Sequence, residues 1–224
     1  MLEVKKSDLN CKRPLLKACL IFDLDGTLVD SETYCLQALI DVIPDLKFTI
    51  SELSCRYRGR KLADIFLDIE ALTDRSLGND IEGMYRQRSS ELIESNASLY
   101  PNVCEALKHI QLPMCIASGG PISKIKVLVD QNGLAPFFGQ RLFSSYDVNS
   151  WKPSPKLFLH AAQAMRELPE KCVVIEDSEV GIAAAHAAGM TPIHFCEPGM
   201  QPLAEHTFED YSTLPSLLES TVAS

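Results

Sequence analysis

The 224-residue sequence predicts an α/β protein in which a parallel β-sheet is covered by helices on both faces. Five short apolar runs, each closed by polar or glycine residues, have the length of buried strands. Segments with helical spacing separate the later runs, as the crossover connections of a parallel sheet require. Residues 31–96 offer no strand candidate, which predicts a helical insert after the first strand.

The first predicted strand is Ala18–Phe22, and it ends at a sharp Asp-Leu-Asp-Gly turn. Pro121 is favourable in the first turn of a helix, and Gly189 is a typical helix stop. The C-terminal residues 207–219 predict a short edge strand and a last helix. The other predicted strands are 113–117, 141–143, 172–175 and 191–195, and the predicted helices are 121–132, 154–166 and 179–188.

The insert has apolar residues at helical spacing, among them Leu36, Leu39, Ile40 and Ile43. The domain organisation that follows has three parts. Residues 1–17 form a polar N-terminal arm, residues 18–30 and 97–224 form a Rossmann-like core, and residues 31–96 form a helical domain inserted into it.

Composition excludes several classes of protein. Lysine and arginine number 21 against 30 aspartate and glutamate, a net charge of −9, so binding to nucleic acid is not expected. The sequence has no apolar stretch long enough for a membrane span. The apolar run after the basic N-terminal residues is broken by Asp23 and is too short for a signal peptide. Eight cysteines without a CxxC pair fit a reducing compartment. We therefore expect a cytoplasmic protein. We also expect a monomer.

Polar residues follow four of the predicted strands: Asp23, Ser118, Ser145 and the pair Glu176-Asp177. In parallel α/β sheets, ligands bind beyond the carboxyl ends of the strands. These side chains therefore predict the functional site.

Asp23-Leu24-Asp25-Gly26-Thr27 is the strongest motif. Asp-Gly is a common turn pair, but two acids directly after a buried strand are a costly choice for a plain turn. Asp23 is placed to act as a nucleophile toward phosphorus. Asp25 would protonate the leaving oxygen and later activate water.

The motif, extended to Ser31, resembles the first motif of the haloacid dehalogenase superfamily. Ser118, Lys152 in Trp-Lys-Pro-Ser-Pro, and Glu176-Asp177 resemble the second, third and fourth motifs, in the same order. The resemblance runs from about residue 18 through nearly the whole chain. It implies a phosphatase of the β-phosphoglucomutase-like subgroup with a helical cap, which closes over the site and chooses substrates.

The resemblance also implies roles for the motif residues. Mg²⁺ would be held by Asp23 and Asp177, by the main-chain carbonyl of Asp25, and by Glu176 close by. Two carboxylates and a phosphate dianion need such a countercharge, and hard oxygen ligands select Mg²⁺. The phosphate would be held by Ser118, Gly119 and Lys152.

The stretch Arg58-Gly59-Arg60-Lys61 places three cations in the predicted cap of an acidic protein. A solvated basic turn accounts for it equally well. The functional interpretation is that Arg60 or Lys61, with Arg58 as a further candidate, meets the non-phosphate end of an anionic substrate.

The partner expected is a small phosphorylated metabolite. Residues 114–196 resemble family members that act on 6-phosphogluconate, which implies this sugar acid phosphate as substrate. Cys35 stands where phosphosugar mutases carry a histidine, which disfavours mutase activity, and Asp25 argues against a dehalogenase. A phosphonate hydrolase using Lys61 stays open, as does a silent phosphate-binding module on the same fold.

Overall fold

A computed structural model describes residues 19–44 and 46–222, so the predicted arm, residues 1–17, lies outside the described residues. The core is a six-stranded sheet in the order β5-β4-β1-β6-β7-β8, and every neighbouring pair is parallel. Its strands are β1 (Cys19–Phe22), β4 (Met114–Ser118), β5 (Leu142–Ser144), β6 (Cys172–Glu176), β7 (Thr191–Phe195) and β8 (His206–Phe208).

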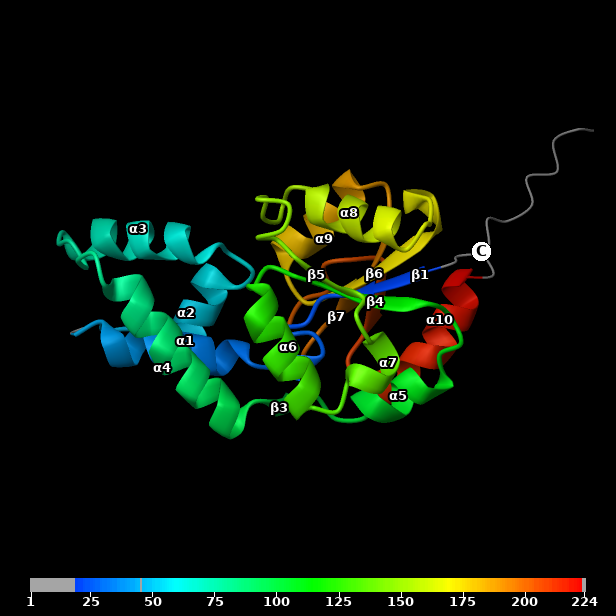
Figure 1. Ribbon diagram of the computed structural model, residues 1–224, viewed down its shortest axis with the longest axis horizontal. Coiled ribbons are helices and arrows are strands. Elements are labelled where there is room, and N and C mark those ends of the chain that lie inside the picture. The colour runs from blue at the N-terminus through cyan, green and yellow to red at the C-terminus, as the bar shows by residue number, and fades with distance from the viewer. Residues whose placement is uncertain (1–18, 45, 223–224) are drawn as a thin grey trace, which may run out of the picture.

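Helices cover both faces of this sheet (Figure 1). Alternate residues of the buried strands explain the two layers, since successive side chains point to opposite faces. Leu20 and Phe22 belong to one apolar cluster, and Cys19 and Ile21 to the other. The first face carries α5 (Val103–His109), α6 (Ile122–Gln131), α7 (Ala135–Phe138) and α10 (Leu214–Val222); the second carries α8 (Lys156–Ala164) and α9 (Glu179–Ala187).

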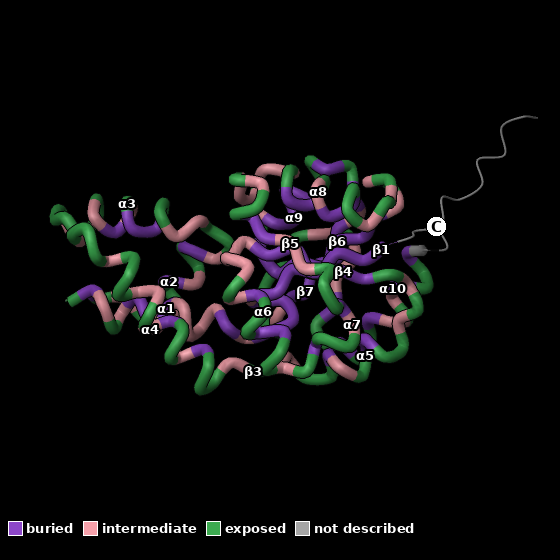
Figure 2. The backbone as a smooth tube through the Cα atoms, viewed as in Figure 1, coloured by how far each residue is buried: buried purple, intermediate pink, exposed green. Residues whose placement is uncertain are grey.

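Residues 31–96 are called the insert below. At their described positions, helices joined by loops are the only regular secondary structure. These helices bury an apolar cluster of their own, which includes Leu39, Leu53, Tyr57 and Ile69. The outward sides of α3 and α4 are largely exposed (Figure 2). The helices are α1 (Glu32–Val42), α2 (Ile50–Tyr57), α3 (Leu62–Thr73) and α4 (Ile81–Asn96).

The structure confirms the predicted α/β class, the five predicted strands and the edge strand with the last helix near the C-terminus. Three features were not predicted. An antiparallel pair of two-residue strands, β2 (Val29–Asp30) with β3 (Ser98–Leu99), lies where the chain passes from the core to the insert and back. The short helices α5 and α7 are the other two. Within the described residues, no helix is long and apolar enough to cross a bilayer.

Candidate active site

The predicted site residues meet at one edge of the sheet because β1 lies between β4 and β6. Asp23 follows β1, Ser118 ends β4, and Glu176 ends β6. Together with side chains of the insert they line a cavity of about 200 Å³. Ser145, the remaining polar strand end, is buried but does not line the cavity. Nine of the ten predicted site residues do: Asp23, Asp25, Arg60, Lys61, Ser118, Gly119, Lys152, Glu176 and Asp177.

Lys152 lies between the carboxylates of Asp23 and Glu176 and pairs with both. All three side chains are almost fully buried. Burial, together with the charges of Glu176 and Asp25, raises the pKa of Asp23 to about 8, although Lys152 acts in the opposite direction. Burial opposes the charged ammonium, but the two carboxylates outweigh it and raise the pKa of Lys152. The lysine therefore stays cationic beside Asp23.

Both carboxylate oxygens of Glu176 accept hydrogen bonds from protein groups. Oε1 accepts from Lys152, and Oε2 accepts from the backbone N–H groups of Asp177 and Ser178, each at 2.9 Å. Gly181 allows this arrangement, because a Cβ there would lie 1.9 Å from Glu176 Cδ. Glu176 thus holds Lys152 in place beneath α9.

Asp25 is surrounded by hydrogen-bond donors. Its Oδ1 accepts from Ser31 Oγ and from Lys124 Nζ, the latter at 2.5 Å, and its Oδ2 accepts from Ser118 Oγ at 3.1 Å. Burial acts to raise the pKa of Asp25, but Lys124, Ser31 and Ser118 outweigh it and the pKa lies below its ordinary value. Asp23 and Asp25 thus have environments that push their pKa values in opposite directions.

Ser118 and the glycines after it open the β4 end of the cavity. The Ser118 hydroxyl accepts from the Gly120 N–H at 3.1 Å, which shapes the turn into α6. A Cβ at Gly119 would meet no atom within 4 Å, so the space beside this residue is open. The Ser118 hydroxyl and the backbone of Gly119 therefore border open space in the cavity.

Asp177 is nearly buried and accepts from Thr27 Oγ1 at 2.9 Å. Its carboxylate packs on Gly26, where a Cβ would lie 2.6 Å from Asp177 Oδ2. Burial and repulsion from Glu176, Glu32 and Asp23 raise the pKa of Asp177 well above its ordinary value. The nearby cations therefore do not fully offset the repulsion between the buried carboxylates at this site.

Arg58 is the one predicted site residue that does not line the cavity. Its guanidinium pairs with Glu32, Asp177 and Glu197, and its side chain is only 16% exposed. The guanidinium therefore bridges the insert to the core instead of facing the cavity.

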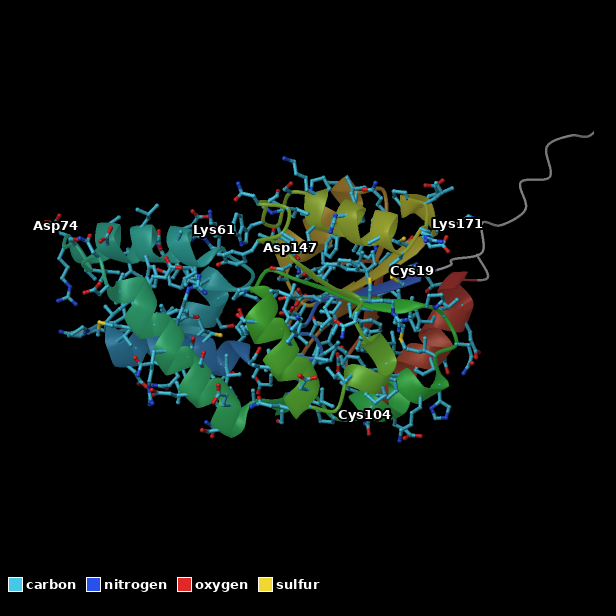
Figure 3. The ribbon with its side chains drawn as sticks, in the orientation of Figure 1. Cys19, Lys61, Asp74, Cys104, Asp147 and Lys171 are labelled. Atoms are coloured by element: carbon cyan, nitrogen blue, oxygen red, sulfur yellow. The ribbon has the colours of Figure 1, made fainter. Side chains whose placement is uncertain are left out.

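Arg60 and Lys61 form part of the insert's wall of the cavity. Lys61 Nζ lies 4.0 Å from the centre of the Trp151 ring, on the core loop next to Lys152. Figure 3 shows Lys61 at the edge of the insert, near the core loop that carries Asp147. The Arg60 guanidinium lies 5.6 Å from the centre of the Tyr57 ring. Both cations are thus held beside aromatic rings at the junction of insert and core.

Arg86 and Lys124 are two further charged residues of the cavity that were not predicted. Arg86 of α4 donates to the Tyr146 hydroxyl at 2.9 Å, which joins the insert to the core a second time. Lys124 of α6 reaches Asp25 as described above. The only local signal for Lys124 is a lysine in the first turn of a predicted helix, where cations are unfavourable.

The carboxylates supply oxygen ligands of the kind that Mg²⁺ prefers. Within residues 19–44 and 46–222, no three His, Cys, Asp or Glu side chains are grouped as a ready metal cage. Glu176 has both oxygens engaged, whereas Asp23 and Asp177 are buried, carry raised pKa values and lie at the cavity.

Comparison with known proteins agrees with this arrangement. The chain is 34% identical over 204 residues to 6-phosphogluconate phosphatase of Escherichia coli K12, covering 88% of this chain and 92% of the relative. It is 31% identical to hexitol phosphatase B of the same organism, covering 90% and 93%.

A crystal structure of a haloacid dehalogenase-like protein of unknown function from Agrobacterium tumefaciens has a TM-score of 0.79 and 27% identity, covering 91% of this chain and 98% of that one. The family model for haloacid dehalogenase-like hydrolases matches residues 17–189. This match spans all four acidic, serine and lysine motifs at the sheet edge, and the chain belongs to the haloacid dehalogenase-like hydrolase family.

Proposed function

We propose that this protein is a Mg²⁺-dependent phosphatase that hydrolyses a small phosphorylated sugar or sugar acid, with 6-phosphogluconate as the preferred substrate. One observation carries the proposal. A buried carboxylate, Asp23, paired with a buried ammonium, Lys152, lines the same cavity as a second carboxylate, Asp25. The insert adds the cations Arg60, Lys61 and Arg86 to the lining of this cavity. The relative named for 6-phosphogluconate supports the choice of substrate.

In the first step, an oxygen of Asp23 attacks phosphorus and the bond between phosphorus and the ester oxygen breaks. The leaving oxygen takes a proton from Asp25, so the alcohol departs neutral. In the second step, water attacks phosphorus, Asp25 takes its proton, and the bond to Asp23 breaks to release phosphate. Lys152 and Ser118 hold the phosphoryl oxygens during both steps.

Asp23, Asp177 and the main-chain carbonyl of Asp25 are the proposed holders of Mg²⁺. The raised pKa values of both carboxylates indicate a site that favours added positive charge. When bound, the ion would neutralise charge on the transferring phosphoryl group. Glu176 stays a predicted nearby ligand, and its hydrogen bonds with Lys152 and with backbone N–H groups support a role in positioning Lys152 as well.

The insert is proposed to act as a cap over the site. Closing it would exclude water and bring Arg60 and Lys61 to the far end of the substrate. A sugar acid phosphate carries a carboxylate there, which these cations would bind. Cys35 lines the cavity. The family resemblance places a histidine at this position in phosphosugar mutases, so the cysteine supports hydrolysis over phosphoryl transfer between sugar hydroxyls.

The test is phosphate release from 6-phosphogluconate, glucose 6-phosphate, β-glucose 1-phosphate and a purine monophosphate, each with Mg²⁺ and with EDTA. Release that needs Mg²⁺ and is fastest on 6-phosphogluconate is the expected result. Folded protein that releases phosphate from none of them would contradict the proposal and favour a silent binding module.

A further inference from the structure

The cations that line the cavity differ in whether a carboxylate neutralises them. Three of them form ion pairs with carboxylates: Lys124, Lys152 and Arg86. Arg60 and Lys61 line the cavity too, and within the described part of the chain neither has a carboxylate at ion-pair distance. The insert therefore brings uncompensated positive charge to the cavity wall.

Lys61 is held by an aromatic ring of the core and not by its own helix. It is the N-cap residue of α3, where its side chain makes no capping hydrogen bond and the helix dipole repels a cation. Its Nζ lies over the ring of Trp151, 4.0 Å from the ring centre, and both residues line the cavity. The face of an indole attracts an ammonium without accepting its charge, so N–H groups that point away from the ring stay free to donate. Trp151 therefore fixes the ammonium without neutralising it.

Trp151 is itself fixed by its neighbours. The next residue in the chain is Lys152, whose buried ammonium pairs with Asp23. The Trp151 carbonyl accepts from the Ser154 N–H at 3.0 Å. The indole packs edge-to-face on the Tyr146 ring, with ring centres 5.2 Å apart and planes at 83°. Two adjacent residues thus hold the cation proposed to bind phosphate and the cation of the insert.

The same core loop meets the insert at a second point. Arg86 of α4 donates to the Tyr146 hydroxyl at 2.9 Å and keeps its ion pair with Glu82. This contact joins α4 to the loop, whereas the contact with Trp151 joins the start of α3 to it. The two contacts can be tested separately, because Tyr146→Phe deletes the hydroxyl and keeps the ring beside Trp151.

We infer that Trp151 is a positioning residue for substrate selection: its ring holds the Lys61 ammonium at the cavity wall, so that the site favours phosphate esters with a carboxylate at their other end. The inference rests on the proposed phosphatase function and extends its specificity to a core residue. Trp151 makes and breaks no bond in the reaction. It acts only through the place of Lys61.

The test compares 6-phosphogluconate with glucitol 6-phosphate, which has the same open chain and a hydroxymethyl group in place of the carboxylate. The quantity to measure is the ratio of the two kcat/KM values. Trp151→Leu should lower this ratio about tenfold, the scale of a desolvated cation–π contact. Trp151→Phe, which keeps an aromatic face, should retain most of the ratio.

Two further variants separate this role from a general one in joining the insert to the core. Tyr146→Phe should leave the ratio unchanged, even if it lowers both kcat/KM values. In a Lys61→Ala background, Trp151→Leu should not lower the ratio further, because the side chain that it positions is already absent.

Trp151 is the only tryptophan in the sequence, so its fluorescence reports this contact directly. Lys61→Met should shift the emission maximum in the absence of substrate, because the charge over the indole is removed. Arg60→Met is the matched control for the emission, since the Arg60 guanidinium lies beside the Tyr57 ring. In Asp23→Asn, which should bind without turnover, 6-phosphogluconate should change the emission more than glucitol 6-phosphate does.

A ratio in Trp151→Leu equal to that of the wild type, or a further fall in the Lys61→Ala background, would overturn the inference and leave the proposed function intact. A wild type that hydrolyses both esters equally well would do the same. Wild-type protein that hydrolyses neither ester would overturn the proposed function and the inference with it. Should Trp151→Leu fail to fold, the fluorescence decides, and an emission of Lys61→Met that matches the wild type would overturn the inference.

Discussion

Arg58 in the insert and Asp177 at the sheet edge form an ion pair, with Arg58 Nε 3.4 Å from Asp177 Oδ2. The same guanidinium lies 2.6 Å from Glu197 Oε1 and 3.0 Å from Glu32 Oε2. One arginine therefore links the position of the insert to a carboxylate that we propose as a Mg²⁺ ligand. Sequence alone grouped Arg58 with Arg60 and Lys61, because nothing in the stretch shows which of the cations turns toward the core.

Arg58→Gln is predicted to lower the free energy of unfolding by about 3 kcal/mol, since it leaves buried carboxylates without their cation. Urea denaturation at neutral pH in EDTA measures this. Arg88→Gln is the control, because Arg88 pairs with Asp41 at an exposed position and such pairs contribute about 1 kcal/mol or less. Mg²⁺ should narrow the deficit of Arg58→Gln. Equal losses in the two variants would contradict the bridging role.

At Gly59 the backbone of the insert lies close to the core. It has φ of +71°, and a Cβ would lie 2.5 Å from Val180 Cγ2 and 2.8 Å from Ser178 Oγ, at the start of α9. Gly78 also has positive φ, +85°, but a Cβ there would meet nothing within 4 Å. The two glycines share the backbone strain of a substitution and differ only in the contact.

Gly59→Ala and Gly78→Ala should each cost about 1–2 kcal/mol of stability for the left-handed conformation. Only Gly59→Ala should also reduce kcat/KM, by about tenfold or more, because the added methyl group holds the insert away from α9. Steady-state kinetics beside thermal denaturation of both variants separates the two effects. A similar kcat/KM in both variants would show that this approach is not needed for turnover.

Elements and motif residues that are close in sequence could be predicted, and long-range pairs could not. Apolar runs in the sequence predict the strands β1, β4 and β6. Their polar ends meet because parallel strands end at one sheet edge. The pair of Lys124 with Asp25 spans 99 residues, and β2 with β3 is only two residues long on each side. Neither leaves a periodic pattern, so each required the folded chain.

Lys61→Ala tests the role of the insert's cations in choosing the substrate. Lys61 lines the cavity and stacks on Trp151, beside the core lysine that we propose to hold phosphate. The variant should raise KM for 6-phosphogluconate about tenfold, the loss of one charge-assisted hydrogen bond, and raise it much less for glucose 6-phosphate, which has no carboxylate. Lys47→Ala, at an exposed position of the insert, is the control. An equal rise for both esters would remove Lys61 from substrate selection.

Asp23→Asn separates what this carboxylate does for catalysis from what it costs the fold. The amide cannot attack phosphorus, so turnover should vanish on every ester. Folding should improve in EDTA: burial raises the pKa of Asp23 from 3.8 to about 8, so the folded state binds the proton more tightly than the unfolded state. The contribution of this group to stability is therefore full below pH 3.8 and is lost as the pH rises to 8.

The melting temperature of Asp23→Asn should accordingly exceed that of the wild type by more at pH 8 than at pH 5, because the amide escapes the cost of ionisation. Asp130→Asn is the control, because Asp130 lies on the exposed side of α6. It should change neither the activity nor the difference in melting temperature between pH 5 and pH 8. Mg²⁺ should reverse the order at pH 8 by stabilising the wild type, whose charged carboxylate it would bind. An active Asp23→Asn would remove the nucleophile from this mechanism, and a stability gain that did not grow with pH would show that Lys152 fully neutralises Asp23.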